Sequence, residues 1–381
     1  MRSLTFRTSS VLLSPTMFSS LLLAASAFTA VRAQTSSSFP AGVIATGTQG
    51  VTNPPVATMG TAVNQTSMAR LLSINSIDDF CIFAPPDPDS TIADTETEEV
   101  AWCTKPRNNA RIIPDGTITG VSFLKTDFYV QVYGYGDFTK LNIQDLDEGG
   151  ELDPHGATGA GNPVGGNVTT NIVDGVDEPI AEWMLYIDYN QFCVRACTNA
   201  NATYPAEFMC WHELDEMGCE FVMPGNYEFN GTFETCEADV AYPPGWYPTA
   251  TSDGTTLFST FAQYFTGTFT SDGTVVGYTV GDLITPSTAF FTPSSSNCVT
   301  TPTIANGIQL NSAGTPTGTS SVPGESTTNT GSGSTSPTGA QSSSGSSAGT
   351  RDVRIGTVDG QFAAIALISL VSGIAAVALL H

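Results

Sequence analysis

The sequence predicts a mainly β protein: an antiparallel sandwich or barrel with one or two short helices, stapled by disulfides and flanked by disordered arms. Three observations predict this fold class. All eight cysteines and most aromatic residues lie within residues 78–303. Short runs of β-branched and aromatic residues recur through that region. The segments on either side are dominated by Ser, Thr, Gly and Pro, which bury too little apolar surface to fold.

The expected strands are short segments with alternating or β-branched character. They are residues 117–124, 128–133, 139–143, 182–189, 255–264 and 274–280. Because only short turn-like breaks separate the first three, we expect an antiparallel meander there. Residues 210–218 alone have a helical pattern, which ends at Gly218.

The N-terminal residues are typical of a secretory signal peptide covering 1–33. Arg2 and Arg7 precede an apolar run, and Ala30-Val31-Arg32-Ala33 supplies small residues at a cleavage site. The alternative is a membrane-anchoring helix, but Ser14-Pro15 interrupts the apolar run. Residues 34–77 are then expected to be a disordered arm.

The C-terminal residues have the layout of a glycosylphosphatidylinositol (GPI) attachment signal. Residues 304–349 are expected to be a Ser/Thr-rich, O-glycosylated stalk, and 350–381 a signal that is removed. We favour Ser347 as the attachment residue, with Ser346 and Ala348 next to it as alternatives. A true membrane span is the competing interpretation, but only His381 follows the apolar run, without the cytoplasmic Lys or Arg that such a span carries.

The charge balance excludes one class of partner. The chain has 36 acidic against 12 basic residues, a formal charge of −24. A nucleic-acid binder needs a positive surface to neutralise phosphates, so a nucleic-acid partner is excluded. Such an anionic surface repels anionic neighbours or collects cations.

An even cysteine count in an exported domain predicts four disulfides. Sequence alone leaves many pairings open. The pairing we favour is Cys81 with Cys103, Cys193 with Cys219, Cys197 with Cys210, and Cys236 with Cys298. Zinc ligation by Cys193, Cys197 and Cys210 is disfavoured, since their spacing matches no standard finger.

Four Asn-x-Thr sequons predict N-glycosylation. They stand at Asn64, Asn167, Asn201 and Asn230, each in a polar context.

The most suggestive carboxylates are Glu151 and Asp153, in the segment Gly149-Gly150-Glu151-Leu152-Asp153-Pro154-His155-Gly156. In a strand they would share one face, and paired acids can cleave glycosides. The alternative is a turn in which the acids cap the backbone or bind a cation. Calcium is a third role, because Asp145-Leu146-Asp147-Glu148 precedes them, although there is no EF-hand loop.

The few histidines limit other chemistry. His212-Glu213 begins like a zincin helix, but Glu216 stands where the second imidazole is needed, so a metalloprotease is rejected. No Gly-x-Ser-x-Gly elbow supports a serine hydrolase. His155 and His212 are candidates for haem-iron ligands from across the domain. The alternative is that His155 stabilises its glycine loop and His212 lies at the surface.

Several motifs together resemble a known family. They are Cys81-Ile82-Phe83-Ala84-Pro85-Pro86, Glu99-Val100-Ala101-Trp102-Cys103, the segment from Gly149 to Gly156, Gly161-Asn162-Pro163, Phe192-Cys193-Val194-Arg195-Ala196-Cys197 and Ser296-Asn297-Cys298. This combination resembles the secreted macrophage-activating glycoproteins of basidiomycete fungi. The resemblance implies a cell-surface or wall mannoprotein with no established enzyme activity.

A more distant resemblance is to the cytokine-inducing glycoprotein of pathogenic yeasts, and it implies capture of extracellular haem. His155 is the best single candidate ligand for that role.

The sequence therefore predicts an extracellular, GPI-anchored surface or wall glycoprotein that is a binding module and not an enzyme. Its candidate ligand-binding residues are His155, Glu151 and Asp153. Expected partners are the membrane, through the lipid, and cell-wall polysaccharide or haem. No cofactor is expected unless haem is the ligand. Haem or metal capture and a glycosidase using Glu151 and Asp153 remain alternatives.

Overall fold

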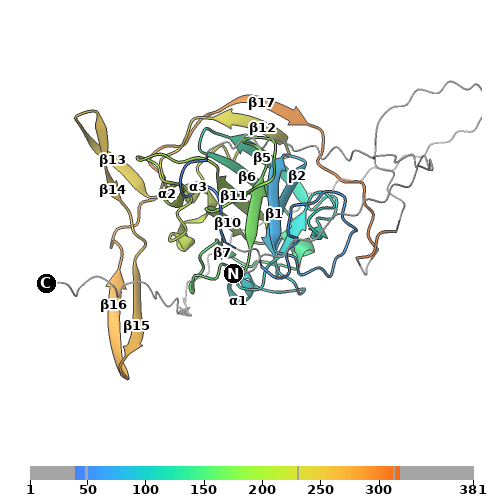
Figure 1. Cartoon of the computed structure of the whole chain (residues 1–381), viewed down its shortest axis with the longest axis horizontal. Helices are drawn as coiled ribbons and strands as arrows, with labels where there is room; N and C mark the ends of the chain where they lie inside the picture. Colours follow the sequence, from blue (N-terminus) through green and yellow to red (C-terminus); the bar gives the residue numbers. More distant parts are fainter. Residues whose placement is uncertain (1–38, 48–49, 230, 312–313, 318–381) are drawn as a thin grey trace, which may run out of the picture. The chain divides into compact units, whose positions relative to one another are not determined.

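A computed structural model describes residues 39–47, 50–229, 231–311 and 314–317. The segments expected to be a signal peptide and a GPI signal, with Ser347, and most of the expected stalk lie outside these residues. The described part is mainly β, as predicted, and contains two large sheets (Figure 1). In the described residues no helix is both long and apolar enough to cross a bilayer.

The first sheet has six strands. Their order is β4 (Arg111–Ile112), β3 (Val100–Cys103), β2 (Asp79–Ala84), β1 (Leu71–Ser76), β8 (Asn167–Thr170) and β9 (Glu178–Ile180). The β1–β8 and β3–β4 pairs are parallel, and the remaining neighbours are antiparallel.

The second sheet has seven strands. Their order is β17 (Ser295–Thr301), β12 (Phe233–Ala238), β5 (Ile118–Lys125), β6 (Tyr129–Gly136), β11 (Gln191–Cys197), β10 (Trp183–Ile187) and β7 (Gly150–Leu152). Only β12 and β5 run parallel. Both sheets are therefore mixed, where the sequence predicted antiparallel ones, because strands distant in the chain become neighbours.

Two further antiparallel pairs form separate two-stranded sheets (Figure 1). One joins β13 (Trp246–Ser252) to β14 (Thr255–Thr260), and the other joins β15 (Phe265–Ser271) to β16 (Thr274–Val280). β14 and β16 fall where the sequence predicted strands, at 255–264 and 274–280, whereas β13 and β15 were not predicted.

Aromatic contacts join the two large sheets into a sandwich. Phe80 on β2 stacks on Phe192 of β11 at 5.8 Å between ring centroids. Phe83, on the same strand, lies 5.5 Å from Trp183 of β10. All four side chains are buried in one continuous core cluster. Burial of such rings is the main stabilising contribution of the interface.

The expected meander is right for two strands and wrong for the third. β5 and β6 pair antiparallel, as predicted. Residues 139–143 are not a strand, because a 3₁₀ helix, η1, spans Phe138–Leu141. Its buried residues, Phe138 and Leu141, are three apart, a spacing that brings both onto one side of a 3₁₀ turn. Asn142 then ends it in the left-handed region with φ of 75°.

The helix expected at 210–218 is also wrong. In place of one helix there are three short ones: α2 (Ala206–Met209) precedes the segment, η2 (Asp215–Met217) lies within it, and α3 (Gly218–Val222) begins at its last residue. A further short helix, α1, covers Ile92–Thr95. Gly218 has φ of +69°, so a continuous helix cannot pass through it.

The folded domain starts earlier than the expected residue 78. Val43 is fully buried, and Ile44 forms a β-bridge with Ile180. Strand β1 lies inside the first sheet, although the sequence assigned it to a disordered arm. At the other end, the carboxylate of Asp115 accepts hydrogen bonds from the amides of Asn306 and Gly307 at 2.8 and 2.9 Å. The start of the expected stalk therefore contacts the domain.

Four disulfides cross-link the domain. They join the pairs favoured from the sequence: Cys81–Cys103, Cys193–Cys219, Cys197–Cys210 and Cys236–Cys298. The first connects directly opposed residues of β2 and β3. All eight sulfurs are in these bonds. The cysteines consequently offer no thiolate for a zinc ion.

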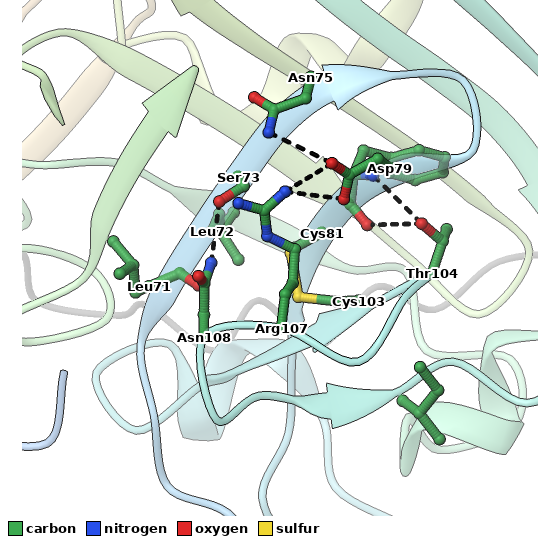
Figure 2. Close-up of a disulfide and its surroundings, with 12 residues drawn as sticks. Leu71, Leu72, Ser73, Asn75, Asp79, Cys81, Cys103, Thr104, Arg107 and Asn108 are labelled. Atoms are coloured by element: carbon green, nitrogen blue, oxygen red, sulfur yellow. Dashed lines mark hydrogen bonds and ion pairs between the residues drawn. A yellow bond between two sulfur atoms is a disulfide. The ribbon is translucent and has the colours of Figure 1, made fainter. Parts of the chain in front are cut away.

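A buried polar network stands beside the Cys81–Cys103 disulfide (Figure 2). Nη1 of Arg107 donates to both carboxylate oxygens of Asp79, at 2.7 and 2.6 Å. Nδ2 of Asn75 reaches the same carboxylate at 3.3 Å. The Arg107 side chain is only 2% exposed, so this ion pair is shielded from water. It fixes the loop after β3 onto β1 and β2.

Candidate functional site

The sequence-predicted ligand-binding residues occupy the β7 edge of the seven-stranded sheet. Glu151 lies on β7, directly opposite Tyr186 of β10. Asp153 and His155 follow in the loop after the strand. Glu151 and Asp153 are two residues apart, and the Asp153 carboxyl contributes to raising the pKa of Glu151.

The loop after β7 is a tight turn held by Asp153. Its Oδ1 accepts hydrogen bonds from the amides of His155 and Gly156, at 2.6 and 2.8 Å. Its backbone exchanges two hydrogen bonds with Asn162, at 2.8 and 2.9 Å. Gly156 has φ of +57°, and a Cβ there would meet the carbonyl carbon of Gly161 at 2.8 Å. These contacts explain Gly156 and match the capping role left open for Asp153.

The two histidines, far apart in sequence, lie together. The rings of His155 and His212 stack with centroids 4.5 Å apart and planes 16° apart. Nε2 of His155 is 2.9 Å from Oε2 of Glu182, and Nδ1 of His212 is 3.6 Å from Oδ1 of Asp153. The hydrogen bond to Glu182 raises the pKa of His155 above its usual value.

This geometry bears on the haem hypothesis. Two axial imidazoles direct a nitrogen at the iron from opposite faces of the macrocycle. Here the rings lie face to face, and Nε2 of His155 is engaged by Glu182. The pair as folded does not offer such a ligand set, and haem capture by His155 alone stays a prediction.

Four acidic side chains gather around β7, and we call them the carboxylate cluster: Glu96, Glu151, Asp153 and Asp215. Glu96 follows α1, and Asp215 begins η2. Nδ2 of Asn162 donates to Glu96 at 2.8 Å. Burial, with further contributions from Asp215 and Asp153, raises the pKa of Glu96 to about 7.

Glu151 is the most enclosed member of the carboxylate cluster. It is only 5% exposed. Burial raises its pKa well above the usual range, and the adjacent Asp215 carboxyl adds to this effect. The hydroxyl of Tyr186, directly opposite on the paired strand, is also buried, and its interaction with the Glu151 carboxyl partly opposes this rise in the pKa of Glu151. Asp215, by contrast, is exposed, so the cluster reaches solvent on that side.

The arrangement is poorly suited to glycoside cleavage by Glu151 and Asp153. A glycosidase needs two carboxyl groups flanking a bond of the substrate. Glu151 is enclosed, and Oδ1 of Asp153 is occupied by two backbone amides. The glycosidase alternative consequently has no support from the geometry of this pair.

A row of half-buried aromatic side chains extends from the histidine pair. Trp211 lies 5.8 Å from His212 and 5.5 Å from Phe208 between ring centroids. The contacts continue from Phe208 to Trp246 at 5.4 Å and from Trp246 to Phe258 at 5.1 Å. We call Phe208, Trp211, Trp246 and Phe258 the aromatic row. It connects the segment after α2 to the β13–β14 pair.

Sequence reasoning missed Glu96, Tyr186, Asp215 and the aromatic row. Their positions are separated from the Gly149–Gly156 motif by tens of residues, and no common spacing relates them. The sequence offered only one indication of an acidic site, the excess of acidic over basic residues, and this excess does not identify individual residues.

The predicted modification sites differ in their surroundings. Asn64 and Asn201 are exposed in loops, where each side-chain carbonyl accepts backbone hydrogen bonds. Asn167 begins β8, is half-buried and donates to the carbonyl of Gly165 at 2.9 Å. Asn230 lies outside the described residues.

The fold and the cysteine pairing define a disulfide-bonded β-sandwich. No protein-family model and no solved structure matches the chain. It is 42% identical over 253 residues to the appressorium protein ROW1 of the basidiomycete Mycosarcoma maydis, covering 66% of this chain and 52% of ROW1. It is also 44% identical over 192 residues to the appressorium protein ROW2 of the same fungus, covering 50% of this chain and 65% of ROW2.

The chain thus spans about half the length of ROW1 and somewhat under two thirds of ROW2. Its similarity is to fungal proteins, in agreement with the fungal origin implied by the sequence motifs. Neither relative carries the name of the macrophage-activating or cytokine-inducing glycoproteins, so those two resemblances stay predictions.

Proposed function

We propose that this chain is a non-catalytic glycoprotein of the fungal cell surface or wall, held by a GPI lipid, whose folded domain is a binding module. The observation that carries the proposal is the 253-residue match to an appressorium protein. That relative is named as a protein of the appressorium, a fungal structure, and this name agrees with display at the fungal cell surface.

The cysteine chemistry supports an exported location. Disulfides persist in oxidising compartments and are rare in the cytosol. Four of them, with no free cysteine among the described residues, fit a chain that passes through the secretory pathway. The signal sequences expected at both ends agree with this route.

The lipid anchor can be tested on protoplasts, which lack the wall that would retain a released protein. An epitope placed after residue 34 should move to the medium when phosphatidylinositol-specific phospholipase C is added. A matched variant that lacks residues 362–380 should appear in the medium without the enzyme. Retention of the full chain on treated protoplasts would refute the anchor.

We further propose that the binding module takes cell-wall polysaccharide, with the aromatic row and the neighbouring His155 as its surface. Aromatic rings with one open side suit the apolar faces of sugar rings, and their polar atoms suit the hydroxyls. His155 is 44% exposed on its side chain and lies against His212, which contacts Trp211. At this end the aromatic row is therefore followed by His212 and the partly exposed, polar ring of His155.

Sedimentation with insoluble glucan, chitin and mannan tests this ligand class. Trp211→Ala should lower the bound fraction on at least one polymer by about fivefold, since losing the contacts of one aromatic ring costs about 1 kcal/mol. Tyr264→Ala removes an exposed aromatic ring outside the row and should leave binding unchanged. Absence of binding to all three polymers, or equal losses in both variants, would refute the assignment.

A further inference from the structure

We propose that the aromatic row binds a cationic amino-sugar polymer, deacetylated chitin, in preference to a neutral polysaccharide. The inference rests on the polysaccharide binding proposed for this row and specifies the chemical class of the sugar. Three observations carry it: the extent of the ring surface, the charge of the segment that supplies two of its rings, and the distribution of basic residues along the chain.

The ring surface extends beyond the four residues of the aromatic row. Tyr242 lies 5.3 Å from Phe258 and 5.7 Å from Phe290 between ring centroids, and Phe290 is 53% exposed. We call the whole run of ring contacts the ring strip: His155, His212, Trp211, Phe208, Trp246, Phe258, Tyr242 and Phe290. Apolar surface that is left partly open to solvent marks interaction sites. An extended strip suits a linear polymer, because successive sugar rings can each lie on a different side chain.

The segment that supplies Phe208 and Trp211 also carries exposed acids. They are Glu207, Glu213, Asp215 and Glu216. Glu207 directly precedes Phe208, and its charge contributes to raising the pKa of His155, so its carboxylate acts on the His155 end of the ring strip. Among the described residues, none of these four acids forms an ion pair with a lysine or arginine. The ring strip is therefore bordered by negative charge.

The chain supplies little positive charge to balance these acids. No lysine or arginine lies between Arg195 and Arg351, the stretch that contains every ring of the strip except His155. Arg195 itself is fully buried. The two histidines at the end of the strip pair with other carboxylates, at 2.9 and 3.6 Å. The negative charge beside the ring strip consequently favours a positively charged ligand and repels an anionic one.

A glucosamine unit satisfies both the rings and the charge. Its sugar ring has an apolar face for an aromatic side chain. Its ammonium group can pair with a carboxylate or lie over the face of an indole ring. N-acetylglucosamine has the same ring and linkage without the charge, and a lysine peptide has the charge without the sugar ring. The combination of rings and carboxylates therefore selects the deacetylated polymer among these three.

Isothermal titration of the purified glycoprotein with glucosamine hexamer and N-acetylglucosamine hexamer tests the proposal. The titrations are done in low salt at about pH 5.5, where exposed carboxyl groups are ionised. We expect the glucosamine hexamer to bind about tenfold tighter or more. Salt at about 0.5 M should remove most of this difference, because it screens exposed charges. A lysine hexamer should bind more weakly than the glucosamine hexamer.

Two kinds of variant separate the contribution of the rings from that of the charge. Trp211→Ala should weaken the binding of both sugar hexamers about fivefold. Glu207→Gln combined with Glu213→Gln should weaken only the glucosamine hexamer, also about fivefold, and these exposed replacements leave the fold intact. Asp89→Asn is the matched control, because it removes a charge from an exposed residue in the loop between β2 and α1. This control should bind both hexamers as the wild type does.

The outcomes distinguish this inference from the proposed function. Equal or tighter binding of the acetylated hexamer would overturn the preference for a cationic sugar and leave polysaccharide binding in place. Equal binding of the lysine hexamer, or unchanged glucosamine binding in Trp211→Ala, would overturn it too, because charge alone would then explain the affinity. If neither sugar hexamer binds while glucan or mannan still sediments the protein, only this inference fails. If no polymer binds, both fail.

Discussion

Replacing Glu96 with glutamine should stabilise the protein at alkaline pH and leave its stability unchanged near pH 4. Burial is the main reason that the pKa of Glu96 rises from 4.5 to about 7, and Asp215 and Asp153 add to it. The folded state therefore holds this proton more tightly than the unfolded state does. Stability contributed by the protonated carboxyl is complete below pH 4.5 and is lost as pH rises to about 7.

The magnitude follows from the width of that pH interval. A change from 4.5 to about 7 corresponds to about 3 kcal/mol. Glu96 is only half-buried, so solvent screening reduces the expected effect to about 2 kcal/mol. The amide oxygen of the introduced glutamine can still accept the hydrogen bond from Asn162. The variant should therefore lose the charge and keep the contact.

Urea denaturation of the disulfide-intact protein in EDTA, from about pH 4 to pH 8.5, measures this difference. EDTA removes any cation that would neutralise the carboxylate. Glu98→Gln is the matched control, because Glu98 is exposed and lies two residues after Glu96. This variant should leave the free energy of unfolding unchanged at every pH. An equal gain for Glu96→Gln at both pH extremes, or no gain at pH 8.5, would refute the reasoning.

Two further predictions concern the core of the second sheet. Nε and Nη2 of the fully buried Arg195 donate to Oε1 of Gln131 at 2.9 and 2.7 Å, so Gln131→Leu leaves charged donors unpaired and should cost about 3 kcal/mol in urea denaturation. A cost below about 1 kcal/mol would contradict this. Replacing Cys236 and Cys298 together by serine opens a loop of 62 residues and should lower the free energy of unfolding by about 4 kcal/mol. Replacing Cys197 and Cys210 together by serine opens a loop of 13 residues and should cost about 3 kcal/mol. A larger loss of stability from this double replacement than from that of Cys236 and Cys298 would contradict the loop-entropy explanation.

The strands predicted correctly are those whose signal is local. β5 and β6 alternate clearly and are joined by a short turn, so pattern and pairing agree. β1 was missed because it is short, follows a Thr- and Ser-rich segment and pairs in parallel with β8, nearly a hundred residues away. Residues 139–143 misled because Leu141 and Ile143 alternate with polar residues as in a strand, whereas packing buries Phe138 and Leu141 together in a 3₁₀ turn.

The same distinction applies to the candidate site. The motif around Glu151, Asp153 and His155 is visible because glycine, proline and acids crowd one short segment. No sequence motif surrounds Glu96 or Asp215, since each belongs to a different short helical segment that packs beside β7. A site assembled by tertiary packing can therefore be located from sequence at its tightest loop, while its remaining members require the fold.

The ion pair beside the first disulfide permits a test with a built-in comparison. Asp79 pairs with the buried Arg107, whereas the adjacent Asp78 pairs with Lys105 at 2.7 Å, with side chains 51% and 38% exposed. Removing one partner of a buried pair leaves an uncompensated charge, so Asp79→Asn should cost about 3 kcal/mol. The value is at the lower end of the usual range because Asp177 remains 3.4 Å from Arg107.

Asp78→Asn should cost less than about 1 kcal/mol, since water screens an exposed pair. Salt separates the two cases further, because added salt weakens the exposed pair and scarcely affects the shielded one. The measurement is urea denaturation of both variants at low and high salt, with the disulfides intact. Equal costs for Asp78→Asn and Asp79→Asn would mean that burial does not set the strength of this network, and the stabilising role assigned to Arg107 would fail.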